Sequence, residues 1–215
     1  GTNLDAKFND TVEDGPCEGD KVITRVWTLD DGCGNILTQK QLITVSDTLK
    51  PIFPKPADMT LTTEDGASCP GTADISLTVD QNNQVATGNA AFTYTVHGIT
   101  IDGPTVYSDN CSTGDNLQLF VWNIFEDWDG PADDCQRKIR VIWRVYDDCG
   151  NFQQRQQIFT ILENTPPVIS CPADRTVNCE DSTDSTVDGA SFATATDNCD
   201  PDPAITRSDE VLAGK

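Results

Sequence analysis

The sequence has little positive charge and few of the residues that usually perform chemistry. Its 215 residues include 14 Lys and Arg against 35 Asp and Glu, which gives a formal net charge of −21, and only one histidine, His97. Such a charge repels phosphate backbones and anionic lipid head groups, so we expect neither a nucleic-acid partner nor direct membrane insertion. The sequence also lacks an apolar run near the ~18 residues of a membrane-spanning helix. It contains no G-x-S-x-G motif, Walker loop or dinucleotide fingerprint, and we therefore predict that the protein is not an enzyme.

Glutamate is scarce as well, since 28 of the 35 acidic residues are Asp. Asp favours turns and loops over helix interiors. Short runs of alternating polarity lie between clusters of Gly, Pro, Asn and Asp, which is typical of strands in an all-β protein. The clearest run, residues 139–145, places Ile139, Val141, Trp143 and Val145 on one face and Arg140 and Arg144 on the other. We expect little or no helix.

Nine cysteines are present, but none belongs to a Cys-x2-Cys pair of the kind that binds zinc. The surrounding acids would raise rather than lower a thiol pKa, which argues against reactive thiols. We therefore expect disulfides and an oxidising, extracellular location. The alternative is a cytosolic protein with buried free thiols.

The chain repeats itself with an offset of 116 residues. The stretch ITRVWTLDDGCGN (23–35) recurs as IRVIWRVYDDCGN (139–151), and KPIFPKPADMTL (50–61) recurs as PPVISCPADRTV (166–177). A further echo relates YSDNC, ending at Cys111, to ATDNC, ending at Cys199. Self-similarity of this kind is the signature of tandem modules.

We predict three modules: the C-terminal part of one (1–47), a complete one (48–162) and the N-terminal part of a third (163–215). The complete module carries an insertion near 72–108. Because the two ends of the sequence are in the same phase of the repeat, we expect it to be a segment of a longer chain.

These motifs, W-x-[LV]-x-D-x-C-G-N, a Pro-rich linker followed by [CK]-P-A-D, and [ST]-D-N-C, resemble the hyalin-repeat-like, immunoglobulin-type modules of large secreted Bacteroidota adhesins, including gliding-motility adhesins. The resemblance spans nearly the whole chain. It implies tandem immunoglobulin-like β-sandwich modules, stapled by disulfides, in a non-enzymatic structural and adhesive segment at the bacterial cell surface. Its partners would be neighbouring modules of the same chain, and surface glycans or other cell-surface proteins. The complete module departs from the typical repeat at Lys55 and Arg155, where that repeat has a cysteine pair.

Strand length excludes a bridge between Cys135 and Cys149, because the ten or so residues between them span roughly 33 Å and a disulfide needs Cα atoms within ~7 Å. In an immunoglobulin-type sandwich, the loop after the second strand and the loop between the last two strands lie at the same end. The resemblance therefore implies two bridges within the complete module: Cys69–Cys135 and Cys111–Cys149. If the partial modules of two chains complement one another, two further bridges would form between chains: Cys17–Cys179 and Cys33–Cys199. Cys171 would then have no partner, because Gln39 occupies the matching position.

The same arrangement would gather oxygen ligands at the linker end of the complete module. Calcium takes about six to eight oxygens, and crowded carboxylates repel one another without a cation. We predict an interdomain Ca²⁺ site with five ligand residues: Asp47, Asp109, Asn110, Asp147 and Asp148. The corresponding groups of the neighbouring modules are Asp31, Glu163, Asp197 and Asn198. The alternative is that these residues only form turns.

A second acidic cluster, EDWDGPADD (126–134), surrounds Trp128 with carboxylates that include Asp127 and Asp129. These three residues could bind a cation or a sugar ring, although a solvated loop beside a core strand is the simpler interpretation. The alternative function is therefore a carbohydrate-binding or accessory module of a secreted hydrolase. The insertion FTYTVHGITI (92–101) is another candidate ligand surface, or an extra hairpin that widens the sheet.

Four Asp-Ser/Thr sites resemble the O-glycosylation acceptors of Bacteroidota surface proteins: Thr11, Thr48, Ser182 and Ser185.

Overall fold

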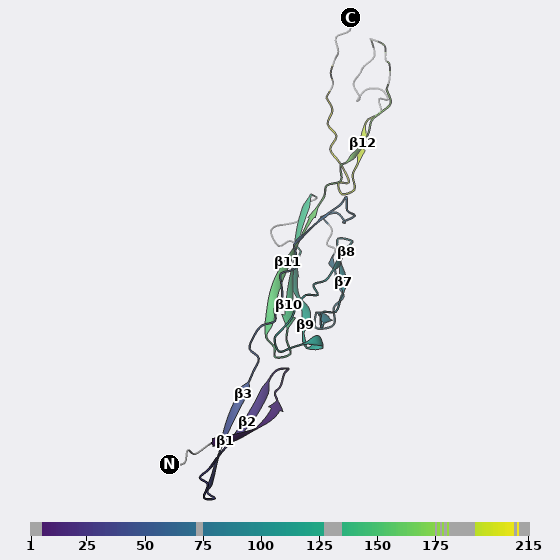
Figure 1. The fold of residues 1–215 in the computed structure, drawn as a ribbon. Helices are drawn as coiled ribbons and strands as arrows, with labels where there is room; N and C mark the ends of the chain where they lie inside the picture. The colour runs from purple at the N-terminus through teal and green to yellow at the C-terminus, as the bar shows by residue number, and fades with distance from the viewer. Residues whose placement is uncertain are drawn as a thin grey trace.

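The computed structural model shows an elongated all-β molecule (Figure 1). It describes residues 6–71, 75–126, 135–174, 176, 178, 180, 192–208 and 210. We call three successive parts the N-terminal unit (6–45), the central unit (50–162) and the C-terminal unit (the described residues between 165 and 208). The N-terminal and C-terminal units lie at opposite ends of the central unit (Figure 1). Within the described residues the helical structure is confined to one 3-10 turn, η1 (Gly114–Asn116), which confirms the expectation of little helix.

The N-terminal unit is a single antiparallel sheet with the strand order β1-β2-β3. Its strands are β1 (Ala6–Asp14), β2 (Lys21–Asp30) and β3 (Ile36–Val45). The register places Trp27 between Phe8 and Gln39 on neighbouring strands. All of β1 and nearly all of β3 is exposed, so this sheet has an apolar face that stays open to solvent.

The central unit contains a five-stranded sheet and a three-stranded sheet. The larger sheet, with the order β4-β11-β10-β9-β6, comprises β4 (Met59–Thr62), β6 (Gln84–Thr87), β9 (Gln118–Phe125), β10 (Gln136–Tyr146) and β11 (Phe152–Leu162). The smaller sheet, with the order β5-β7-β8, comprises β5 (Ile75–Ser76), β7 (Thr93–Val96) and β8 (Ile99–Asp102). β4 runs parallel to β11, whereas the other pairs of the larger sheet are antiparallel.

The hydrophobic core lies between these two sheets. On β10 the predicted inward face is confirmed, since Ile139, Val141, Trp143 and Val145 are at most 1% exposed. Tyr94 of the smaller sheet packs edge-on against Trp143, with ring centroids 5.6 Å apart. Gln157 of β11 satisfies both polar groups, because its Oε1 accepts hydrogen bonds from Tyr94 Oη (3.0 Å) and Trp143 Nε1 (3.1 Å). A buried polar side chain with all its partners fixes how the two sheets meet.

The insertion near 72–108 supplies the smaller sheet. Its β7–β8 hairpin turns at His97 and Gly98, both with positive φ (48° and 80°), as a two-residue hairpin turn requires. Val96 and Ile101 on this hairpin belong to the core. The hairpin therefore covers the core instead of merely widening the larger sheet.

The sequence repeat is accompanied by repeated local hydrogen bonds. Asn35 donates its backbone N–H and its side-chain amide to the two carboxylate oxygens of Asp31, and Asn151 does the same to Asp147. In the C-terminal unit, β12 (Val168–Ser170) pairs antiparallel with β13 (Thr194–Thr196). The bridge between Ile52 and Ser108 in the central unit lies at the equivalent position. Residues that match in sequence thus fold alike in different units.

Candidate functional site

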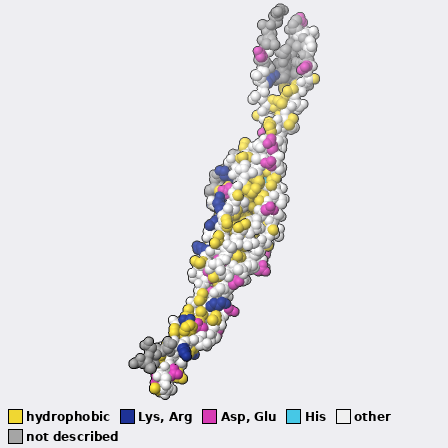
Figure 2. Space-filling model, viewed as in Figure 1, with side chains coloured by type: hydrophobic (Ala, Val, Ile, Leu, Met, Phe, Trp, Pro, Cys, Tyr) yellow, Lys and Arg dark blue, Asp and Glu magenta, His cyan; other side chains and the backbone are white. Residues whose placement is uncertain are grey.

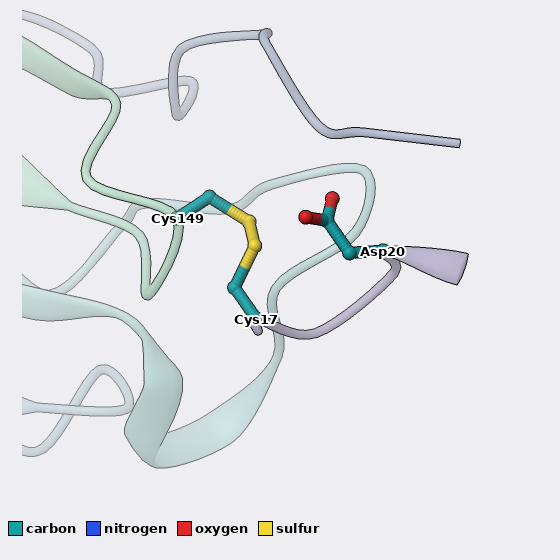
Figure 3. Close-up of side chains that lie close together, drawn as sticks. All are labelled: Cys17, Asp20 and Cys149. Carbon is teal, nitrogen blue, oxygen red and sulfur yellow. A yellow bond between two sulfur atoms is a disulfide. The ribbon is translucent and has the colours of Figure 1, made fainter. Parts of the chain in front are cut away.

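The turn between β1 and β2 attaches the N-terminal unit to the central unit. It is closed by hydrogen bonds from Gly15 N to Asp20 O and from Asp20 N to Cys17 O. Cys17 forms a disulfide with Cys149, which lies 132 residues later in the turn between β10 and β11 (Figure 3). This bond therefore joins two units.

Glu18 adds a polar contact beside the disulfide. Its carboxylate accepts hydrogen bonds from Thr113 N (2.7 Å), Thr113 Oγ1 (2.9 Å) and Asn116 Nδ2 (2.8 Å) of the central unit. The Asn116 and Thr113 hydrogen bonds lower the pKa of Glu18. Glu18 N donates to Asp148 Oδ2 (2.7 Å), whose other oxygen accepts from Ser112 Oγ (2.6 Å). The turn is thus held by both carboxylates.

Four other carboxylates converge at this junction: Asp20, Asp47, Asp109 and Asp147. Asp20 and Asp147 are only 8% and 5% exposed. Asp20 Oδ1 accepts from Asp47 N (2.8 Å), and Asp109 Oδ2 accepts from Cys111 N (2.8 Å). Asp47 Oδ2 and Asp109 Oδ1 are buried and accept no hydrogen bond. One carboxylate oxygen from each of these two residues lies within 4.8 Å of the other and of Cys111 Sγ.

The four carboxylates concentrate negative charge at the junction, and this charge shifts the pKa values of neighbouring groups. Burial raises the pKa of Asp147, and the charges of Asp109 and Asp47 raise it further, although hydrogen bonds from Asn151 act in the opposite direction. Burial also raises the pKa of the Cys111 thiol, followed by the charges of the same four carboxylates. The ion pairs of the described residues involve other acids: Asp10, Asp14, Asp58 and Glu126. Carboxylate oxygens that are buried without a donor or a basic partner suit a hard divalent cation such as Ca²⁺.

The structure brings together three of the predicted ligands, namely Asp47, Asp109 and Asp147. Asp148 instead receives the Glu18 and Ser112 hydrogen bonds, and the Asn110 side chain donates to Cys111 Sγ (2.9 Å). Sequence reasoning missed Asp20, because the position 116 residues later is Gln136 and the repeat gives no signal there.

The predicted ligands of the neighbouring modules do not join this cluster. Asp31 lies in an exposed turn, where its oxygens accept from Cys33 N and from Asn35, and these bonds lower its pKa. Glu163 and Asp197 line a hollow of about 330 Å³ at the second junction. The Asn198 side chain donates to Cys199 Sγ (3.3 Å).

This second junction is also covalent. Cys69 of the central unit forms a disulfide with Cys199 of the C-terminal unit, 130 residues later. Cys135 and Asp200 line the same hollow as Cys199. Backbone N–H groups of Asp200 and Cys199 donate to Asp197 and lower its pKa. Each junction therefore combines one disulfide with several acids.

The predicted disulfides paired the wrong cysteines. Neither Cys69–Cys135 nor Cys111–Cys149 forms, because Cys199 and Cys17 from the adjoining units take the bonds to Cys69 and Cys149. Cys111 still lies at the end of the central unit that carries Cys149. It packs closely on Gly19 in the β1–β2 turn, because a Cβ added at Gly19 would lie 2.6 Å from the Cβ of Cys111. The predicted inter-chain bridges do not form, because Cys17 and Cys199 are bonded within the chain. Cys33 and Cys171 are exposed, and Cys179 lies outside the described residues.

The predicted ligand loop of Asp127, Trp128 and Asp129 lies outside the described residues. The neighbouring strand β9, however, carries Trp122, which is 55% exposed. The Arg144 guanidinium stacks on the Trp122 ring at 3.4 Å from its centroid. Trp122 lines a surface hollow of about 470 Å³ together with Asn82, Asn83, Gln118, Phe120, Val121, Tyr146 and Asp147.

Of the predicted glycosylation sites, Thr11 on β1 and Thr48 in the linker are exposed. Ser182 and Ser185 lie outside the described residues.

Comparisons with known proteins gave no relatives: no family model, no curated protein and no solved structure matches the chain. Among the described residues, no helix is both long and apolar enough to span a membrane. The two disulfides indicate an oxidising compartment.

Proposed function

We propose that the chain is a non-enzymatic structural and adhesive segment of an extracellular or cell-surface protein, built from tandem immunoglobulin-like β-sandwich units. The observation that carries this proposal is that both disulfides join different units, Cys17–Cys149 at one end of the central unit and Cys69–Cys199 at the other. Linked domains usually move relative to one another. A covalent bond beside the linker limits that motion, and the Glu18 and Asp148 hydrogen bonds oppose rotation about it.

The resemblance of the repeated motifs to gliding-motility adhesin modules supports the same function. An adhesin holds its binding surface away from the cell, so its stalk must transmit force without collapsing. Thr11 and Thr48 are exposed, which suits the proposed O-glycosylation of such a stalk. Its partners would be neighbouring units and surface glycans or proteins.

Small-angle X-ray scattering of the 215-residue chain tests the stalk function. We expect an extended and rigid particle in the oxidised protein, and a broader distribution of shapes after Cys17→Ser or Cys69→Ser. A matched control is Cys33→Ser, which removes an exposed cysteine that lies outside both disulfides. Equal flexibility of all three variants and the wild type would contradict the proposal.

We further propose that Ca²⁺ completes the first junction. Asp20 comes from the N-terminal unit, Asp47 from the linker, and Asp109 and Asp147 from the central unit, so one ion bound there would hold all three. The buried oxygens of Asp47 and Asp109 that accept no hydrogen bond would be its first ligands. Bound Ca²⁺ would neutralise carboxylates that otherwise repel one another across the junction.

Thermal unfolding with Ca²⁺ and with a chelator tests this site. A ligand at 100 times its Kd stabilises the protein by about 2.7 kcal/mol, and chelation should remove this stabilisation. Asp109→Asn should abolish the Ca²⁺ response, whereas Asp102→Asn at the exposed end of β8 should leave it intact. If millimolar Ca²⁺ did not change the unfolding temperature, the Ca²⁺ site would be excluded, but the proposal of a disulfide-linked stalk would still stand.

A second candidate function is carbohydrate binding, which the Trp122 hollow favours. Exposed aromatic rings beside side-chain amides, here Asn82, Asn83 and Gln118, are typical of surfaces that stack on sugars and hydrogen-bond their hydroxyls. A glycan array should give a signal that Trp122→Ala removes and that Val106→Ala, at a 72% exposed residue outside the hollow, retains. A wild-type array without signal would reject this function.

A further inference from the structure

The larger sheet of the central unit has an outer face, opposite the core, whose charge differs from that of the chain as a whole. Its three middle strands, β9, β10 and β11, contain five of the chain's 14 Lys and Arg and none of its 35 acids. Lys138, Arg140 and Arg144 of β10 alternate with buried core residues and therefore lie on this face. Figure 2 shows Lys and Arg side chains along the side of the central unit on which β10 and β11 lie. Charges more than about 8 Å away are largely screened at physiological ionic strength, so the local charge of this face decides which partner it attracts.

Arg144 lies at the centre of an aromatic cluster on the outer face. Its guanidinium carbon is 3.4 Å from the ring centroid of Trp122 on β9 and 4.7 Å from that of Phe152 on β11. Arg144 Nε donates to Gln154 Oε1 (2.8 Å), and Nη1 donates to Tyr146 Oη (3.2 Å). Two rings and two neutral acceptors thus hold the guanidinium in place, while Nη2 has no hydrogen-bond partner among the described residues.

The cations of this cluster have no acidic counterpart in the part of the chain that the structure describes. Lys50 Nζ lies 5.8 Å from the centroid of the Phe152 ring on which Arg144 also stacks. The ion pairs between described residues use four other basic side chains: Lys21, Arg25, Lys55 and Arg137. Two like charges beside one ring repel each other, and an external anion would relieve that repulsion.

The surroundings of Arg144 also suit a sugar ring. Trp122 and Tyr146 contact Arg144 and line the surface hollow of about 470 Å³ together with the amides of Asn82, Asn83 and Gln118. Exposed rings can stack on a sugar, and amides can hydrogen-bond its hydroxyl groups. The one acid among the described residues that line the hollow is Asp147, whose carboxylate is buried and accepts hydrogen bonds from Asn151. A negative group on the sugar would therefore lie at the Arg144 side of the hollow.

We propose that the outer face of the central sheet binds an acidic polysaccharide whose sugars carry carboxylates. One sugar ring would lie in the hollow against Trp122, and its carboxylate would accept hydrogen bonds from Arg144, because the planar guanidinium matches a planar carboxylate. Lys50 would attract a further carboxylate of the same polymer. This inference rests on the carbohydrate-binding function proposed above and adds the chemical class of its ligand.

The first test compares two forms of one polymer by isothermal titration calorimetry of the 215-residue chain. The forms are polygalacturonate and its methyl ester, which keeps the sugar rings and removes the charge. A chelator must be present, so that Ca²⁺ cannot bridge the polymer to the acids of the first junction. We expect the chain to bind polygalacturonate at least about tenfold more tightly than the ester, and added NaCl to weaken this binding.

The second test uses variants whose circular dichroism spectra match that of the wild type. Arg144→Gln should weaken binding to polygalacturonate by about tenfold and remove the preference over the ester. Arg144→Lys should restore binding only in part, because it keeps the charge and loses the planar fork. The matched control is Arg155→Gln, which removes the same charge from the opposite face of β11 and should bind as the wild type does.

Four results would overturn the proposal. Equal affinity for the charged and esterified polymers would do so and leave carbohydrate binding in place. Equal weakening by Arg144→Gln and Arg155→Gln would show that only overall charge matters. Equally tight binding of poly-L-glutamate would assign the face to acidic polypeptides instead. Absence of binding to polygalacturonate, together with a glycan array without signal, would reject both the acidic ligand and carbohydrate binding.

Discussion

The N-terminal sheet and the central sheet contain the same succession of three strands but differ in what covers them. Trp143 is fully buried between two sheets, whereas its equivalent Trp27 lies in a single sheet, is partly exposed and packs against Phe8 and Arg25. The difference shows that local sequence determines strands and register, while burial depends on a second layer supplied from elsewhere in the chain. It also explains why β2 carries Arg25, paired with Asp10, where β10 carries the buried Val141.

The largest expected effect comes from truncating the two equivalent tryptophans. Trp143→Ala should destabilise the central unit by about 3–5 kcal/mol, because it opens a cavity in a close-packed core. Trp27→Ala should cost less than about 2 kcal/mol, because its ring is partly solvated in the folded state. Denaturant unfolding followed by circular dichroism measures both values. Equal losses would mean that Trp27 is covered in solution.

Removal of the Cys17–Cys149 disulfide should lower the stability of the N-terminal sheet and leave that of the central unit unchanged. Opening Cys17–Cys149 typically costs about 2–4 kcal/mol, and a single-layer sheet has little other support. The variant should combine Cys17→Ser with Cys111→Ser, so that Cys111 cannot replace Cys17 as the partner of Cys149. Calorimetry should then show an early transition for the N-terminal unit and an unchanged main transition for the central unit. A single transition at the wild-type temperature would show that the Glu18 hydrogen bonds suffice.

The strands of both sheets were predictable because apolar and polar residues alternate along each of them. Ile139, Val141, Trp143 and Val145 were expected on one face, and their burial confirms that face. The all-β class followed in the same way from short alternating runs and turn residues. The role of β5, β7 and β8 as a separate covering sheet was not predictable, because a hairpin that widens a sheet has the same alternation as one that covers it.

The junctions were predicted only in part, for a physical reason. Strand geometry expects Cys111 at the Cys149 end, where it packs on Gly19 of the β1–β2 turn, but the neighbouring unit's Cys17 from that turn takes the bond. Asp47 and Asp109 were expected together, whereas Asp20 enters through a turn of a different unit. Contacts between two units depend on how the units dock, and the sequence pattern within one unit does not predict them.

A smaller effect should come from the glutamine that anchors each tryptophan. Gln157→Ala removes the acceptor of Trp143 and Tyr94 and the donor to Ala57, so buried polar groups lose their partners at a cost of about 2–3 kcal/mol. Gln41→Ala removes the acceptor of Trp27 Nε1 (3.0 Å) and should cost less than about 1 kcal/mol, because water can replace it on the open sheet. The two variants can be compared by urea unfolding at a low protein concentration. A comparable loss at Gln41 would again indicate that the N-terminal sheet is covered.

The smallest effect concerns Asp58, whose carboxylate fastens the Pro-rich linker to β11 and has no counterpart on β3 within the described residues of the N-terminal unit. It accepts hydrogen bonds from Lys55 Nζ (2.6 Å) and Ile158 N (3.0 Å). The Lys55 bond, and then that of Ile158, hold the pKa of Asp58 below its ordinary value. Because the folded-state pKa is the lower one, the unfolded chain binds the proton first as the pH falls. The stabilisation is therefore complete at neutral pH and is lost as the pH drops through the folded-state pKa.

Its size is limited by solvent, because the Asp58 side chain is 44% exposed. Screening leaves a few tenths of a kcal/mol, which Asp58→Asn should remove at neutral pH. Unfolding free energies of the wild type and of Asp58→Asn should therefore converge in acid and differ at neutral pH, while Asp102→Asn follows the wild type throughout. If the difference instead stayed constant down to the lowest pH at which the protein folds, the contribution of Asp58 would be steric. The covered and open sheets would then differ in packing alone, and charge would have no part in attaching the linker to β11.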